Sequence, residues 1–338
     1  RFRELTDTPL PLADVRAAMA GGQKVPEIAS NARRQPTEFG NAERMLDDYG
    51  DGLMYVPEIG GWYIWTSVYW RRAADVEIEH LAKETVRALP DEGRSIESDS
   101  LRADFYRFCG ASQRAQMVAH MVRLAASDPR VVVPMAELDK RTYFLGVGNG
   151  VIDLRSGKLL APDQEYRITS ITEVEYDRAA TCPLFEQTVA DVFYGDASMI
   201  RFFQRLVGYS LMGSPDEDVM VIPYGLGSNG KSTVLGAVRG ALGGHAKMAR
   251  ADTFLSSGAG ASSAGAARED VLRLRGARFV YIGEPDEGSE LREGLIKSMT
   301  GGEALPARGL YSKTTVEVAP TWVAFMPTNH KPIVKGDD

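Results

Sequence analysis

A glycine-rich segment offers the clearest chemistry in the sequence. Residues 225–232 read GLGSNGKS and match the pattern G-x-x-x-x-G-K-[ST]. They lie between a short apolar segment, residues 219–222, and a stretch with helical periodicity, residues 233–242. Glycines let backbone N–H groups wrap around phosphate oxygens, and the positive end of the following helix favours an anion. The pattern therefore predicts a nucleotide phosphate site rather than an accidental glycine-rich turn.

Two side chains at the end of this segment carry the expected chemistry. Lys231 would reach the β- and γ-phosphate oxygens, and the Ser232 hydroxyl would be a ligand of Mg²⁺. The cofactors predicted on this basis are ATP and Mg²⁺. The residues expected to surround the phosphates are Gly225, Gly227, Ser228, Asn229, Gly230, Lys231, Ser232 and Thr233.

Two further polar residues each follow an apolar, strand-like segment. Glu284 follows residues 279–282, and Asn329 follows residues 322–326. The carboxyl ends of parallel strands form the ligand-binding edge of an open α/β sheet. Glu284 would there hold the metal and orient the attacking water, while the Asn329 amide would hydrogen-bond the γ-phosphate. Taken alone, an asparagine at this position is more often a turn residue. Three neighbouring residues are expected to be solvated loop residues: Asp286, Glu287 and His330.

The compact spacing of these residues resembles a known family of ATPases. Lys231 and Glu284 lie 53 residues apart, and Asn329 follows 45 residues later. This arrangement is similar to that of superfamily 3 helicases, a branch of the AAA+ ATPases. Other segments resemble phage and plasmid primase-helicases related to the poxvirus primase-helicase. These segments are residues 40–44, 61–65, 149–157, 176–177, 182–183, 208–211, 228–233, 295–302 and 328–332.

The resemblance implies a role for each catalytic candidate. Lys231 and Ser232 would bind phosphate and Mg²⁺, Glu284 would be the Walker B acid, and Asn329 would be the sensor. Family members often have two adjacent acids in the Walker B element, whereas Pro285 follows Glu284 directly in this chain. The second acid is therefore left unassigned.

The resemblance also implies a way of holding DNA. In the family, a β-hairpin at the position of residues 302–320 projects into the channel of a homo-hexameric ring and contacts single-stranded DNA. The corresponding residues here include Arg308, Tyr311 and Lys313. Two cations beside an aromatic ring suit phosphate contact and base stacking. The aromatic residues of segment 62–70 are instead expected to be core residues, because they occur at strand spacing.

The fold expected from these patterns is α/β. Residues 213–338 would form a P-loop AAA+ core of the superfamily 3 type, with a parallel sheet and an incomplete C-terminal end. A mostly helical α+β accessory domain would occupy residues 38–212, and residues 1–37 would be a linker from a missing upstream domain. Because the chain begins with Arg1, it is interpreted as a piece of a longer polypeptide, with a primase or polymerase module upstream. The family's trans-acting arginine would lie beyond residue 338.

Composition narrows the class of protein. The 338 residues include 44% hydrophobic and 25% charged residues, without an apolar run long enough to span a bilayer. The two cysteines fit a reducing compartment, so a cytoplasmic location is expected, in the host cell if the protein is phage-encoded. The net charge is −7, but residues 219–338 carry 14 Lys and Arg against 12 Asp and Glu, a net of +2. DNA contact is therefore expected in the last third of the chain.

The predicted function is that of an ATP-dependent DNA helicase of phage or plasmid replication. Two alternatives remain open at this stage. One is a replication initiator or loader scaffold that uses ATP with little unwinding. The other is a P-loop phosphotransferase, which would need a second substrate pocket and a lid.

Overall fold

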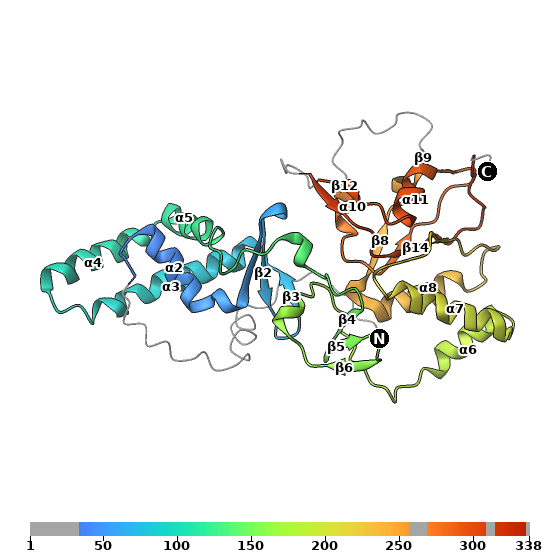
Figure 1. Cartoon of the computed structure of the whole chain (residues 1–338), viewed down its shortest axis with the longest axis horizontal. Coiled ribbons are helices and arrows are strands. Elements are labelled where there is room, and N and C mark those ends of the chain that lie inside the picture. Colours follow the sequence, from blue (N-terminus) through green and yellow to red (C-terminus); the bar gives the residue numbers. More distant parts are fainter. Residues whose placement is uncertain (1–33, 257–268, 309–314, 336–338) are drawn as a thin grey trace. The chain divides into compact units, whose positions relative to one another are not determined.

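The computed structural model describes residues 34–256, 269–308 and 315–335, and these form two compact units (Figure 1). The first unit ends at Leu138 and the second begins at Asp139. Most of the predicted linker, up to residue 33, lies outside the described residues. Among those that are described, no helix combines the length and apolar character needed to cross a bilayer.

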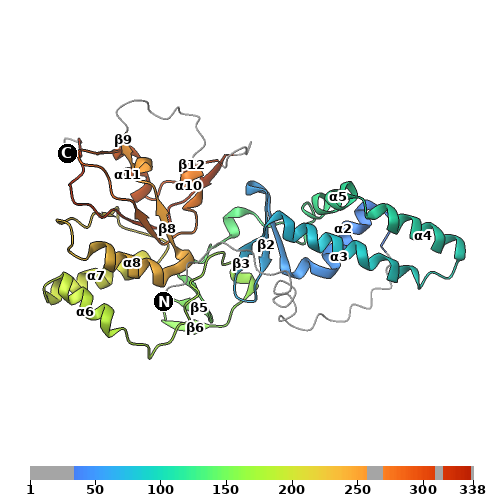
Figure 2. The same ribbon diagram turned by 180° about the vertical axis from the view of Figure 1, so that it is seen from behind.

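The first unit packs helices against a small antiparallel sheet of order β1-β2-β3 (Figure 2). Its described helices are α2 (Glu38–Tyr49), α3 (Asp75–Gly93), α4 (Asp99–Ser112) and α5 (Ala115–Ala125), and its strands are β1 (Leu53–Val56), β2 (Gly61–Trp65) and β3 (Trp70–Arg72). Alternate residues of β1 and β2 face two cores: Leu53 and Ile64 join the helices, whereas Met54 and Tyr63 pack with Trp65 on the other face. The aromatic segment is buried, so its prediction as core is confirmed.

The second unit is built around a four-stranded parallel sheet of order β7-β14-β10-β8. Its helices are α6 (Pro183–Val192), α7 (Ala197–Ser210), α8 (Lys231–Leu242), α9 (Ala251–Phe254), α10 (Glu269–Arg273) and α11 (Glu293–Thr300). Its strands are β4 (Phe144–Val147), β5 (Gly150–Asp153), β6 (Lys158–Leu160), β7 (Met220–Val221), β8 (Ala246–Ala249), β9 (Leu255–Ser256), β10 (Phe279–Ile282), β11 (Glu290–Leu291), β12 (Leu305–Ala307), β13 (Val316–Val318) and β14 (Val323–Phe325). A mixed α/β fold with a parallel sheet is thereby confirmed.

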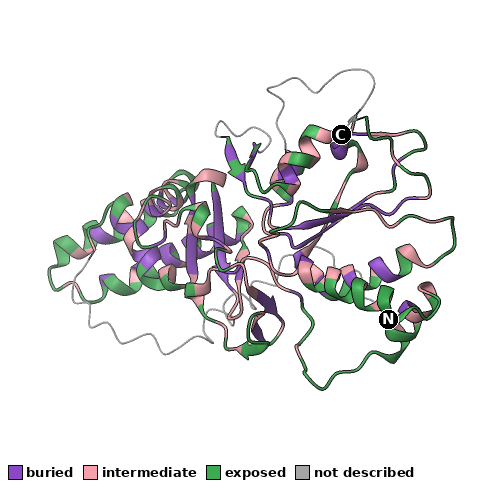
Figure 3. Ribbon diagram, turned by 45° about the vertical axis from the view of Figure 1, so that its right-hand side comes forward, coloured by how far each residue is buried: buried purple, intermediate pink, exposed green. Residues whose placement is uncertain are grey.

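The central strands of the parallel sheet are buried on both faces (Figure 3). Phe279 of β10 and Phe325 of β14 stack with ring centroids 4.2 Å apart, and Leu235 of α8 covers them. Such continuous burial explains why β10 and β14 read as unbroken apolar runs in the sequence. Because β7, β14 and β10 are parallel neighbours, the segments that follow them emerge at the same edge.

Polar side chains attach a second, smaller sheet of order β4-β5-β6 to the opposite end of these strands. Buried His245 donates from Nε2 to the Gly146 carbonyl over 2.8 Å, and burial lowers the pKa of its imidazole to about 4. The buried Arg278 guanidinium donates to the carbonyls of Thr142, at 2.7 Å, and Phe144, at 3.2 Å. A neutral imidazole and a hydrogen-bonded cation are the forms in which such groups tolerate burial.

These contacts explain a difference between the compact units and the predicted domains. The predicted boundary between the accessory and ATPase domains lies between residues 212 and 213, whereas the compact units divide between residues 138 and 139. Carbonyl groups in and beside the small sheet accept hydrogen bonds from Arg278 and His245, which lie next to strands of the parallel sheet. Thr172 adds a further hydrogen bond, in which its Oγ1 donates to the Ala241 carbonyl near the end of α8 over 2.7 Å.

Candidate nucleotide site

The glycine-rich segment forms a loop between β7 and α8 at the carboxyl edge of the parallel sheet. The Gly225 N–H donates to the Thr328 carbonyl over 3.3 Å, and the Thr328 N–H donates to the Pro223 carbonyl over 3.0 Å, so the loop starts beside the end of β14. Helix α8 begins at Lys231, after Gly230 at φ +82°. A Cβ on Gly230 would collide with Val192 of α6, so this turn requires glycine on both backbone and steric grounds.

The three predicted catalytic residues lie together at this edge. Lys231 Nζ donates to Asn329 Oδ1 over 3.0 Å, although the two residues are 98 positions apart. The Asn329 N–H in turn donates to Glu284 Oε1 over 3.2 Å. The result is a continuous hydrogen-bonded chain from the lysine through the asparagine to the carboxylate.

A cavity of about 190 Å³ adjoins this chain. Its lining includes the start of α8, with Ser232, and the Glu284 carboxylate that follows β10. A hydroxyl and a carboxylate are oxygen ligands of the kind Mg²⁺ prefers, and phosphate and water oxygens normally complete its octahedral coordination. The residue types at this edge therefore fit a nucleotide-bound Mg²⁺. Within the described residues, no group of three or more His, Cys, Asp and Glu side chains could hold a metal by itself.

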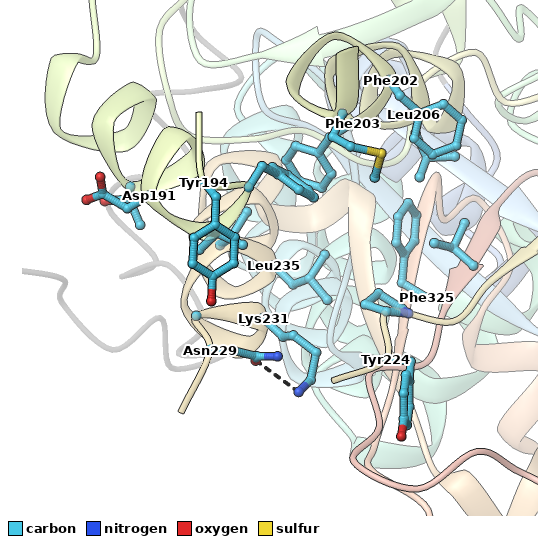
Figure 4. Close-up of a pocket in the computed structure, with 18 of the residues that line it drawn as sticks. Asp191, Tyr194, Phe202, Phe203, Leu206, Tyr224, Asn229, Lys231, Leu235 and Phe325 are labelled. Atoms are coloured by element: carbon cyan, nitrogen blue, oxygen red, sulfur yellow. Dashed lines mark hydrogen bonds between the residues drawn. The ribbon is translucent and has the colours of Figure 1, made fainter. Parts of the chain in front are cut away.

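A second cavity, of about 750 Å³, lies on the other side of the loop (Figure 4). The two cavities share loop residues 228–231. Helix α7 lines the second cavity with Phe202 and Phe203, helix α6 contributes Val192, and Phe325 contributes from the sheet. The rings of Tyr194 and Tyr224 lie on either side of Lys231 in this view. This largely apolar cavity beside the glycine-rich loop has the dimensions and lining of a small-ligand pocket.

Tyr194 has two unusual features in this cavity. It lies in the turn between α6 and α7 with φ +50°, and Gly195 follows at φ +74°. A positive φ is unfavourable for tyrosine, and the residue is 96% exposed, so burial of the ring does not offset this cost. Tyr194 was not predicted as a site residue, because residues 183–212 show only continuous helical periodicity. The Tyr-Gly pair inside that stretch was the available signal for a break.

The predicted DNA-binding hairpin is partly described. Strands β12 and β13 pair antiparallel, with Leu305 opposite Val318 and Ala307 opposite Val316. Arg308 follows β12 and is half-buried. Tyr311 and Lys313 lie outside the described residues, so their contact with DNA stays a prediction.

The remaining polar residues near the site behave as loop residues. Asp286 and Glu287 are exposed, and His330 Nδ1 lies 3.6 Å from Glu287 Oε1 at the surface.

Further from the site, Asn149 has a structural role within one of the family-like segments. Its side chain accepts from the Tyr176 N–H over 2.9 Å and donates to the Tyr176 carbonyl over 3.1 Å.

Comparison with known families agrees with this architecture. Residues 42–194 match the family described as D5 N terminal like. This segment is similar to D5 N-terminal-like domains. The match confirms the resemblance to primase-helicases that the sequence motifs predicted. The matched segment includes residues of both compact units and ends at the turn after α6.

Two viral proteins that are named as helicases are similar in sequence. L207/L206 of Acanthamoeba polyphaga mimivirus is 27% identical over 213 residues, which cover 60% of this chain and 21% of that protein. Protein 022R of Frog virus 3 (isolate Goorha) is 30% identical over 148 residues, covering 43% of this chain and 15% of that protein. The chain thus corresponds to a small part of the length of either relative.

Solved structures of the NrS-1 C-terminal region also align with the chain. One apo structure aligns with a TM-score of 0.47 and 11% identity, covering 90% of this chain and 60% of the other. A second apo structure, of the A form, aligns with a TM-score of 0.46 and 12% identity, covering 88% and 58% of the two chains.

Proposed function

We propose that this chain is the ATP-hydrolysing part of a DNA helicase of phage or viral replication, with an AAA+ core of the superfamily 3 type. The observation that carries the proposal is the hydrogen-bonded chain from Lys231 through Asn329 to Glu284 at the loop of residues 225–232. It joins a phosphate-binding cation, a neutral amide and a general base at one edge of a parallel sheet. The helicase names of two viral relatives support the same proposal.

Each residue has a defined part in the proposed hydrolysis. A water molecule attacks the γ-phosphate and the bond to the bridging oxygen of the departing ADP breaks, while Glu284 orients this water and accepts its proton. Lys231 neutralises charge that develops on the phosphate oxygens, and Asn329 donates from its amide nitrogen to the γ-phosphate. Ser232 and Glu284 would hold Mg²⁺, which supplies further charge neutralisation when bound.

The proposal extends to DNA and to assembly. Arg308, Tyr311 and Lys313 would contact single-stranded DNA at the hairpin of β12 and β13. The proposed active form is a homo-hexameric ring in which hydrolysis moves these hairpins along the strand. The local net charge of residues 219–338, which is +2 in a chain of net charge −7, suits a phosphate-contacting surface in this region.

The test of the proposed function is ATP hydrolysis with and without single-stranded DNA. We expect hydrolysis that DNA stimulates, together with strand displacement that ATP supports and the non-hydrolysable analogue AMP-PNP does not. Equal strand release with both nucleotides would indicate a scaffold that uses ATP only for assembly. Transfer of phosphate to a small-molecule acceptor, unaffected by DNA, would indicate a phosphotransferase.

The larger cavity would receive the nucleobase. Tyr194 would stack on it, because this exposed ring lies beside loop residues that would hold the phosphates. We expect Tyr194→Ala to raise the KM for ATP about 3- to 10-fold with little change in kcat. Tyr194→Phe should restore the wild-type KM, because it keeps the stacking surface.

Leu184→Ala is the matched control for this measurement. Leu184 is on α6, the helix that precedes the Tyr194 turn, and is 80% exposed, but it does not line the cavity. Its removal should leave the KM unchanged. If Tyr194→Ala and Leu184→Ala have the same KM as the wild type, the base binds elsewhere.

A further inference from the structure

Lys231 has an unusual set of partners within the loop. Its ammonium group lies 2.5 Å from the Gly225 carbonyl, 3.0 Å from Asn229 Oδ1 and 3.0 Å from Asn329 Oδ1. An ammonium group has three N–H donors, so these three oxygens satisfy it fully. All three are neutral, and the nearby Glu284 carboxylate instead accepts from the backbone of Asn329. The lysine is therefore held in place while its positive charge stays unneutralised.

The Asn229 side chain lies between Lys231 and Gly225. Its oxygen must face Lys231, because an ammonium group can only donate. Its nitrogen lies directly over Gly225, at a place where a Cβ on residue 225 would collide with it. The absence of a side chain at Gly225 is what allows the Asn229 amide to occupy this position. Figure 4 shows the resulting contact between Asn229 and Lys231.

We infer that Asn229 is a positioning residue for Lys231, an inference that rests on the proposed function. Its amide oxygen holds the ammonium group at the mouth of the loop before the nucleotide arrives. The incoming phosphate oxygens then replace the Gly225 carbonyl as acceptors, so the long lysine side chain loses little further rotamer freedom on binding. A carboxylate in the place of Asn229 would instead cancel the charge that attracts the phosphates. The site thus uses an amide on each side of the cation, Asn229 from the loop and Asn329 from the strand end.

The first test is a double-mutant cycle between Asn229 and Lys231. The affinity for AMP-PNP with Mg²⁺ would be measured by titration calorimetry for the full chain and its variants. We expect Asn229→Ala to weaken binding about 10-fold in the wild-type background, because one charge-assisted hydrogen bond is lost. In the Lys231→Ala background, the same change should alter affinity by less than about 2-fold, because the group that it positions is absent. An equal loss in both backgrounds would overturn the inference, since a merely structural role does not depend on Lys231.

The second test uses the steric relation between Gly225 and Asn229. Gly225→Ala should weaken AMP-PNP binding in the wild-type background by expelling the Asn229 amide, and should weaken it much less when residue 229 is already alanine. Gly227→Ala is the matched control, because a Cβ at this loop glycine meets no atom within 4 Å. Gly227→Ala should change the affinity for AMP-PNP by the same factor whether residue 229 is asparagine or alanine. If Gly225→Ala is equally harmful with and without Asn229, the inference is wrong.

The outcomes separate this inference from the proposed function. A folded wild-type chain that does not bind AMP-PNP would contradict the proposed function itself. Binding by the wild type, without coupling of Asn229 to either Lys231 or Gly225, would contradict only the positioning role. Thermal unfolding of every variant shows whether the compared proteins are folded at the temperature of the titration.

Discussion

Glu284→Gln is expected to lower the rate of ATP turnover by about 10²- to 10⁴-fold while ATP still binds. Glutamine keeps the shape of the side chain, and its oxygen can still accept from the Asn329 N–H. It cannot accept a proton from the attacking water, so the loss should fall on the chemical step. Single-turnover hydrolysis and equilibrium binding of ATP, measured on the same preparation, separate these two effects.

Glu287→Gln is the matched control for this prediction. Glu287 lies three residues further on, is exposed, and approaches His330 at the surface rather than Asn329. Its substitution should leave turnover within about 2-fold of the wild type, as for most changes at exposed sites away from the chemistry. A much larger loss of turnover for Glu287→Gln than for Glu284→Gln would show that Glu287, and not Glu284, is the catalytic acid.

The edge of the parallel sheet was predictable from the sequence for a physical reason. Residues 279–282 and 322–326 are continuous apolar runs, because strands buried on both faces exclude polar side chains. The polar residue after each run then has to lie at the carboxyl edge. Glu284 and Asn329 were therefore both expected at this edge before any tertiary contact was known, and a hydrogen bond joins them there, while their catalytic roles stay a prediction.

The remaining elements carried weaker local signals. Strand β8 has the sequence AKMA, and its partly buried residues form no apolar run, so it was not predicted. The break between α6 and α7 was missed because both helices have similar periodicity on either side of a single Tyr-Gly turn. The larger cavity depends on both of these helices and on Phe325 of β14, which lies far from them in sequence. No local pattern encodes such a surface.

The boundary between the two compact units also could not be predicted from local sequence patterns. Residues 150–154 read as a short β segment, and nothing in their own sequence shows which neighbour they pack against. The partners of the small sheet that they join are single polar residues at the amino ends of distant strands, such as His245 and Arg278. The structural role of such a buried polar residue can be recognised only when the groups that it hydrogen-bonds are known.

Gly213→Ala is expected to destabilise the second unit by about 3–5 kcal/mol, because it displaces a buried charge from its partners. Gly213 has φ +64°, and a Cβ there would overlap the Arg278 guanidinium. That guanidinium is buried and donates to the carbonyls of Thr142 and Phe144. Displacing it would leave a buried cation and two backbone carbonyls without these hydrogen bonds. Urea denaturation, followed by a signal from the second unit, measures the loss.

Gly288→Ala separates the steric effect from the cost of the backbone conformation. Gly288 has φ +77°, but a Cβ there meets no atom within 4 Å, so its substitution should cost only about 1–2 kcal/mol. Shortening Arg278 in the Gly213→Ala background, as in Gly213→Ala/Arg278→Met, should remove the collision. The double variant should then be less destabilised than the sum of the two single variants. If Gly213→Ala costs no more than Gly288→Ala, the Arg278 clamp contributes little, and the small sheet must be held to the core chiefly by His245 and Thr172.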